Sequence, residues 1–148
     1  MKSKCRDIKD VVERSIYFAS IKHVYQVDDN GDPYFLHLHG VANIVREVTS
    51  DQSIIAAAYL HDTLEDAKTT YTELRENFGE RIANLVREVT HEGDQTHGYY
   101  FPRLESRDAI MIKFADRLNN ISRMESWSDK RRAHYLKRSK FWKSEANT

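Results

Sequence analysis

The sequence predicts an all-α fold, a single compact bundle of about seven helices. Three observations favour this class. The chain has five glycines and two prolines among 148 residues, whereas these two types together make up roughly 12% of an average protein. Apolar residues recur at helical spacing along most of the chain, and no segment reads as a convincing strand. Charged residues make up 31% of the chain, which suits helices with solvated outer faces.

The first half of the chain is expected to supply three helices. The first covers about 7–25 and ends before a polar loop at 28–33. The second covers about 36–48. The third runs from about 52 to 61, with Ser50 or Asp51 as its cap. Its centre is apolar on every side, which is typical of a buried central helix.

The second half is expected to supply four more helices. Thr70 and Glu73 form a capping box that opens a helix ending at Gly79. Another helix covers 81–90, and a polar, aromatic loop follows. A long helix covers about 104–124, and a basic helix covers about 129–142. The residues of the long helix expected in the core are Ile110, Ile112, Phe114, Leu118 and Ile121.

The charge balance limits the classes of function. Lys and Arg number 23, as do Asp and Glu, and a chain without basic excess is a poor general nucleic-acid binder. Residues 1–99 nevertheless carry a net charge of −6 and residues 100–148 one of +6. The two parts can form a cleft with an acidic wall for metal and a basic wall for phosphate, or they can be two solvated surfaces.

The chain also carries features of a cytoplasmic protein. It has one cysteine, Cys5, so no disulfide can form within it. Its N-terminus is too polar for a signal peptide, and no apolar run approaches the roughly 20 residues of a membrane span. We therefore expect a cytoplasmic protein of 148 residues and one domain, with no membrane partner.

An unusual group of ionisable residues follows the most apolar stretch. His61, Asp62, Glu65 and Asp66 would all project from one pole of the domain if the third helix continued through them. His37 and Asp116 lie at the edges of two other helices. Each residue alone fits a helix cap or surface group, but the combination of imidazole and carboxylate suits manganese, iron or zinc. Buried charges of this kind need a partner or a metal.

These residues stand in four stretches, at 31–37, 56–66, 78–90 and 113–120. Together the stretches resemble the HD superfamily of metal-dependent phosphohydrolases. Within it, the chain is similar to the hydrolase domain of the RelA/SpoT stringent-response enzymes and to the stand-alone small alarmone hydrolases. The resemblance spans about residues 8–125 and implies the HD-type helical bundle.

The resemblance implies a set of functional residues. His37, His61, Asp62 and Asp116 would bind one Mn²⁺ ion, with Fe²⁺, Zn²⁺ or Co²⁺ as alternatives. Glu65 and Asp66 fall on the catalytic acidic pair of the family, with their individual roles open, and Asn120 falls on a residue that contacts the nucleotide. The implied reaction removes pyrophosphate from the 3′ position of guanosine tetra- or pentaphosphate. A bound divalent ion can activate water for this reaction.

The identity of the substrate depends on further charges. Lys22, Lys113 and Arg117 are candidates for contacting phosphate. Asp28 and Asp29 stand where the family usually has a basic pair, and their charge should weaken phosphate binding unless another group compensates. An HD-type phosphatase acting on NADPH or on a nucleotide 3′-phosphate is therefore the alternative. A binding domain without turnover is a third reading, and the oligomeric state is left open.

Overall fold

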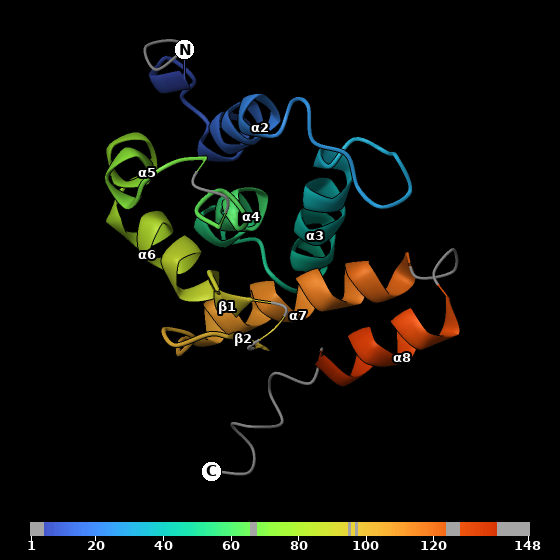
Figure 1. The fold of residues 1–148 in the computed structure, drawn as a ribbon. Coiled ribbons are helices and arrows are strands. Elements are labelled where there is room, and N and C mark those ends of the chain that lie inside the picture. The colour runs from blue at the N-terminus through green and yellow to red at the C-terminus, as the bar shows by residue number, and fades with distance from the viewer. Residues whose placement is uncertain (1–4, 66–67, 95, 97, 124–127, 139–148) are drawn as a thin grey trace.

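Helix α4 (Gln52–Leu60) lies at the centre of the fold (Figure 1). The structure, a computed structural model, describes residues 5–65, 68–94, 96, 98–123 and 128–138. Residues 54–60 of α4 are all buried, as their apolar character predicts. Asp51 is the cap of α4 and accepts a hydrogen bond from the backbone N–H of Ser53.

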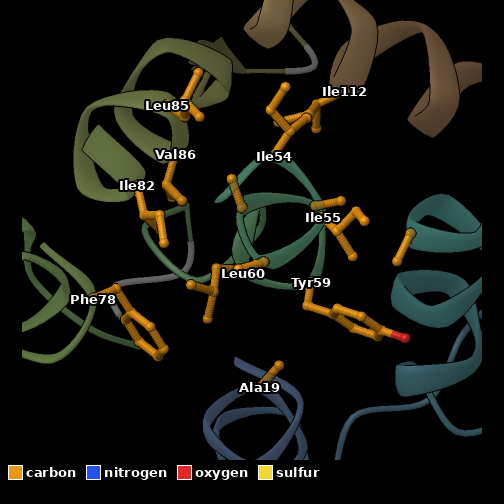
Figure 2. Packing of buried hydrophobic residues seen from close by; sticks show 14 of the residues in the cluster. Ala19, Ile54, Ile55, Tyr59, Leu60, Phe78, Ile82, Leu85, Val86 and Ile112 are labelled. Carbon is orange, nitrogen blue, oxygen red and sulfur yellow. The ribbon is translucent and has the colours of Figure 1, made fainter. Parts of the chain in front are cut away.

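Four helices pack against α4. They are α2 (Val11–Lys22), α3 (Phe35–Val48), α6 (Glu80–Val89) and α7 (Arg107–Ser122). Figure 2 shows how their side chains enclose it: Ala19 of α2 lies on one side and Val86 of α6 and Ile112 of α7 lie on others. This arrangement confirms the predicted all-α class, with a central helix inside a helical shell.

Two further helices complete the bundle. Helix α5 (Tyr71–Phe78) packs on α6, and α8 (Asp129–Arg138) follows α7. Thr70 accepts a hydrogen bond from the N–H of Glu73, which confirms the predicted start of α5. Gly79 separates α5 from α6 at a φ of 90°, a conformation that favours glycine. Residues 139–142 of the expected basic helix lie outside the described residues.

Local structure differs in three places from what the sequence left open or predicted. Helix α4 ends at Leu60, close to its expected end at about 61, so the continuation through the acidic residues is not realised; the Thr63 hydroxyl binds the carbonyl of Leu60 and His61 Nδ1 binds that of Ala58. The expected loop after α6 contains an antiparallel hairpin of β1 (Glu92–Asp94) and β2 (Gly98–Tyr100).

The third difference concerns α7. Phe114, Leu118 and Ile121 are exposed rather than in the core, and Ile110 is only partly buried, whereas Ile112 is buried as expected. The buried face of α7 also contains Lys113 and Asp116. Polar residues occupy this face because it borders the site described below. No helix among the described residues is both long and apolar enough to cross a membrane.

Candidate active site

Three predicted metal ligands from three separate helices meet in the interior. His37 lies near the start of α3, His61 directly follows α4, and Asp116 lies within α7. All three are buried, and one potential ligand atom of each lies within 4.8 Å of the others. Asp116 Oδ1 is 3.0 Å from His37 Nε2 and 3.3 Å from His61 Nε2. The fold thus brings together residues that are distant in sequence.

Asp62 adds a second carboxylate to this cluster. Its Oδ2 lies 3.2 Å from His61 Nε2 and 3.9 Å from His37 Nε2. The hydroxyl of Tyr34 donates a hydrogen bond to the same oxygen. Asp62 is 7% exposed, so the cluster has two imidazoles and two carboxylates in a largely buried setting.

The hydrogen bonds of His61 fix its tautomer. His61 Nδ1 lies 2.7 Å from the carbonyl oxygen of Ala58, which can only accept a hydrogen bond, so Nδ1 carries the proton and donates. The lone pair of a neutral ring is then on Nε2, and this buried atom makes no hydrogen bond although two carboxylates lie beside it. A lone pair directed at two anions is unfavourable unless a cation lies between them. The residues therefore fit a divalent metal with mixed nitrogen and oxygen ligands.

The electrostatics of the cluster lead to the same conclusion. Burial lowers the pKa of His61, but Asp62 and Asp116 together raise it well above its usual value. Burial raises the pKa of Asp116, yet Lys113 and the two imidazoles hold it well below its usual value. The cluster thus stabilises a positive charge, and a proton on His61 would compete with a metal ion.

The second ring nitrogen of His37, Nδ1, also has partners that orient the ring. This nitrogen lies 2.8 Å from Asn119 Oδ1 and 3.1 Å from an Arg123 nitrogen. Asn119 fits here because α3 has a glycine opposite: a Cβ at Gly40 would lie 2.2 Å from Asn119 Nδ2. Neither Asn119 nor Gly40 carried a sequence signal for this role, because their contact joins α3 to α7.

The predicted acidic pair is only partly described. Glu65 lies in the turn after α4, where His91 Nε2 is 3.3 Å from its Oε2. Burial and the charge of Asp62 raise the pKa of Glu65 above its usual value, although His91 and Lys113 oppose the shift. A carboxyl group whose pKa is raised holds its proton more readily than an ordinary one, which suits proton exchange in catalysis. Asp66 lies outside the described residues.

The predicted phosphate-binding residues divide into two groups. Lys113 is buried 3.2 Å from Asp116 Oδ2, and both Lys113 and Arg117 lie over the ring of Phe101. Asn120 Nδ2 lies 3.4 Å from Asp116 Oδ1. Lys113 and Asn120 thus border the cluster, and Arg117 lies beside Lys113 on the Phe101 ring. Lys22 is instead paired with Glu73 of α5 at 3.2 Å.

The two aspartates expected at the mouth of the site are neutralised by arginines. Arg123 donates to Asp28 Oδ2 at 2.7 Å and to Asn120 Oδ1 at 2.8 Å, and Arg131 of α8 pairs with Asp29. The side chain of Asp28 is only 8% exposed. Its charge is therefore balanced within the protein, which is the compensation that phosphate binding would require. No sequence pattern marks Arg123 for this role, because 95 residues separate it from Asp28.

This arrangement of helices and ligand-type residues is that of an HD domain. A family model described as an HD domain matches residues 15–98, more than half of the chain, and the chain belongs to this family. The fold is also similar to the solved structure of a metazoan ortholog of SpoT that hydrolyses ppGpp, with a TM-score of 0.77 and 28% identity, over 90% of this chain and 84% of the other.

One relative that is much longer than this chain and one of comparable length are similar to it in sequence. The guanosine-3′,5′-bis(diphosphate) 3′-pyrophosphohydrolase of Aquifex aeolicus is 36% identical over 135 residues, which are 85% of this chain. The chain spans only 19% of that protein's length. The Xenopus tropicalis enzyme of the same name, MESH1, is 34% identical over 149 aligned positions, and the match covers 86% of this chain and 78% of the relative.

Proposed function

We propose that this protein removes pyrophosphate from the 3′ position of guanosine tetra- or pentaphosphate, leaving GDP or GTP. One observation carries the proposal: His37, His61 and Asp116 converge in the interior with Asp62 beside them. The relatives from Aquifex and Xenopus bear the name of this activity, and the solved structure of similar fold belongs to a protein that hydrolyses ppGpp.

The four residues of the cluster would hold one divalent ion, which we propose to be Mn²⁺. Two imidazoles and two carboxylates suit manganese, and they also suit Fe²⁺, Zn²⁺ and Co²⁺. A bound ion of this kind lowers the pKa of its water and polarises a phosphoryl oxygen. Tyr34, Asn119 and the carbonyl of Ala58 would hold the ligands in place through their hydrogen bonds.

The protein's own residues would handle the protons and the phosphates. Glu65, whose pKa is raised by burial, would accept a proton from the attacking water or deliver one to the ribose 3′ oxygen as its bond to phosphorus breaks. Asp66 is the proposed second member of this pair. Arg117 and Asn120 are proposed to contact the nucleotide, while Lys113 balances the charge of Asp116.

The alternative substrate is another phosphorylated nucleotide, such as NADPH or a nucleotide 3′-phosphate. The observation in its favour is the pair Asp28 and Asp29. The two aspartates pair with Arg123 and Arg131, and the loop at 28–33 itself has no basic residue that could bind a phosphate. The lone cysteine and the absence of a basic excess favour a cytoplasmic protein whose partner is a small nucleotide rather than a nucleic acid.

A panel of nucleotides and metals tests the proposal. The purified chain is incubated with guanosine tetraphosphate, NADPH and a nucleotide 3′-phosphate, each with Mn²⁺, Fe²⁺, Zn²⁺ or Co²⁺, and released phosphate and pyrophosphate are measured separately. We expect pyrophosphate from guanosine tetraphosphate, with the highest rate in Mn²⁺. Phosphate release from the other nucleotides alone would establish the alternative. A stable nucleotide complex without any release would identify a binding domain.

Substitution of Gly40 tests the support of His37. In Gly40→Ala the new methyl group must displace the Asn119 side chain, so we expect Mn²⁺ affinity to fall roughly 10- to 100-fold, as for other outer partners of metal ligands. Isothermal titration with Mn²⁺ measures the loss. Asn119→Ala should weaken binding to a similar extent, and the double variant should be no weaker than Asn119→Ala alone. Additive losses would show that Gly40 acts by another route.

A further inference from the structure

The segment between α6 and α7 contacts residues of the site at both of its ends, through His91 and Phe101. His91 follows the last residues of α6, and Phe101 follows strand β2 of the hairpin. The rings of His91 and Phe101 meet edge to face, with their centres 6.1 Å apart. The two ends of the segment therefore touch at the base of the hairpin. Figure 1 shows the strands β1 and β2 beside α7. The base contributes side chains to the site.

His91 holds one oxygen of the proposed catalytic carboxylate. Its Nε2 lies 3.3 Å from Glu65 Oε2, and the side chains of His91 and Glu65 are 27% and 15% exposed. The other oxygen of Glu65, Oε1, is buried and has no hydrogen-bond partner. The carboxylate is therefore held on one side, while its second oxygen is buried with its hydrogen-bonding capacity unused.

Phe101 holds His91 against this side of the site. One face of its ring receives the ammonium of Lys113, 4.3 Å from the ring centre, and the guanidinium of Arg117 lies 5.8 Å away. Lys113 in turn pairs with Asp116. A continuous set of contacts thus joins Glu65, through His91 and Phe101, to α7.

The charges around Glu65 give His91 a second effect. Asp62, from the same turn, raises the pKa of Glu65, as burial does, whereas His91 and Lys113 of α7 lower it. Removing His91 would leave a carboxyl group that is freer to rotate and more readily protonated. Both changes would impair an acid–base group without altering the contacts of the metal cluster.

We propose that His91 is a positioning residue, which fixes Glu65 through Oε2 so that Oε1 can exchange the proton of the reaction. The proposal depends on the function proposed above. It makes the base of the β1–β2 hairpin part of the active site, although the chain distance between residues 65 and 91 and the polar character of the segment gave no sign of it.

Three variants separate positioning from a general effect on the hairpin. His91→Ala removes the contact. His91→Gln retains an N–H that can donate to Glu65 Oε2. Glu92→Gln is the matched control, because it breaks an exposed ion pair of 2.6 Å between the hairpin and Arg103, which follows it, and no contact joins Glu92 to Glu65 among those that the structure describes. The kcat, the KM and the pH profile for pyrophosphate release are measured for each.

We expect His91→Ala to lower kcat roughly 10- to 100-fold, the effect of a misplaced catalytic group, with little change in KM. The limb of the pH profile that reports Glu65 should move to higher pH, since the pKa of Glu65 rises: this is the acidic limb if Glu65 accepts the proton and the alkaline limb if it donates one. His91→Gln should recover most of kcat, and Glu92→Gln should match the unmodified protein. An unchanged kcat in His91→Ala, or a kcat in His91→Gln as low as in His91→Ala, would overturn the proposal.

A measurement without substrate separates this proposal from the proposed function. The side-chain carboxyl carbon of Glu65 is titrated by NMR in the metal-free protein labelled with ¹³C-glutamate, and Glu65→Gln identifies its signal. The pKa should be higher in His91→Ala than in the unmodified protein. If the pKa does not move, the proposed contact is wrong, whatever the activity. If it moves but no nucleotide in the panel is hydrolysed, the contact stands and the proposed function fails.

Discussion

Asp62→Asn should reduce pyrophosphate release by more than about 100-fold, because even outer partners of metal sites contribute 10- to 100-fold. The asparagine has nearly the same size and can still accept the hydrogen bond of Tyr34. It removes, however, the negative charge that lies 3.2 Å from His61 Nε2. A divalent ion would lose one anionic ligand of the two in the cluster, and both affinity and rate should fall together.

Metal content and turnover are measured on the same preparation of Asp62→Asn. Bound Mn²⁺ is determined by elemental analysis after dialysis, and circular dichroism reports whether the helices remain. Asp129→Asn makes the same chemical change on the exposed surface of α8, so it should retain full activity. A folded Asp62→Asn protein that binds Mn²⁺ and turns over normally would show that the metal site lies elsewhere.

The central helix and its ligands were predictable because the pattern is local. Residues 54–60 are apolar on every side, so burial of α4 follows directly from the sequence. His61 and Asp62 must then lie at the edge of the core. His37 and Asp116 also interrupt or adjoin apolar helical faces, and a charge in such a place requires a partner. Their positions at the edges of separate helices already suggested one site, the family resemblance implied that they bind one ion, and the fold brings all four together.

The end of α4 was expected at about residue 61, but spacing alone could not exclude that the helix continues. The spacing of His61, Asp62, Glu65 and Asp66 is compatible with a helix. The helix nevertheless ends at Leu60, because the side chains of His61 and Thr63 bind two of its last carbonyls. Side chains that compete for backbone groups can end a helix without any change in hydrophobic pattern.

The inward face of α7 could not be deduced from periodicity. Phe114, Leu118 and Ile121 recur at helical spacing and predict a core face, yet they are exposed. Lys113 and Asp116 face inward because they neutralise each other and border the histidines. A polar helix face is buried when its partners come from other elements, and such partners are visible only in the folded chain.

The same reason explains the residues that sequence reasoning missed. His91 meets Glu65 across 26 positions of the chain, and Arg123 meets Asp28 across 95. Neither pair has a spacing that marks a motif. The negative charges of Asp28 and Asp29 were visible, but their neutralisation depends on the end of α7 and the start of α8.

Lys113→Met should lower the free energy of unfolding of the metal-free protein by about 3–5 kcal/mol, the usual cost of removing one partner of a buried ion pair. Lys113 is 3% exposed and lies 3.2 Å from Asp116 Oδ2. Burial alone would raise the pKa of Asp116, and Lys113 is the largest influence that lowers it. Methionine fills a similar volume and can contact the Phe101 ring, so the loss reports chiefly the charge.

Urea denaturation in the presence and absence of Mn²⁺ measures this loss and its recovery. A divalent ion beside Asp116 should restore part of the missing charge balance, so Mn²⁺ should stabilise Lys113→Met at least as much as the unmodified protein. Binding at 100 times the dissociation constant stabilises by about 2.7 kcal/mol. Lys130→Met on the exposed side of α8 should stay within about 0.5 kcal/mol of the unmodified protein. If Lys113→Met were equally stable, Asp116 would not depend on Lys113 for its charge.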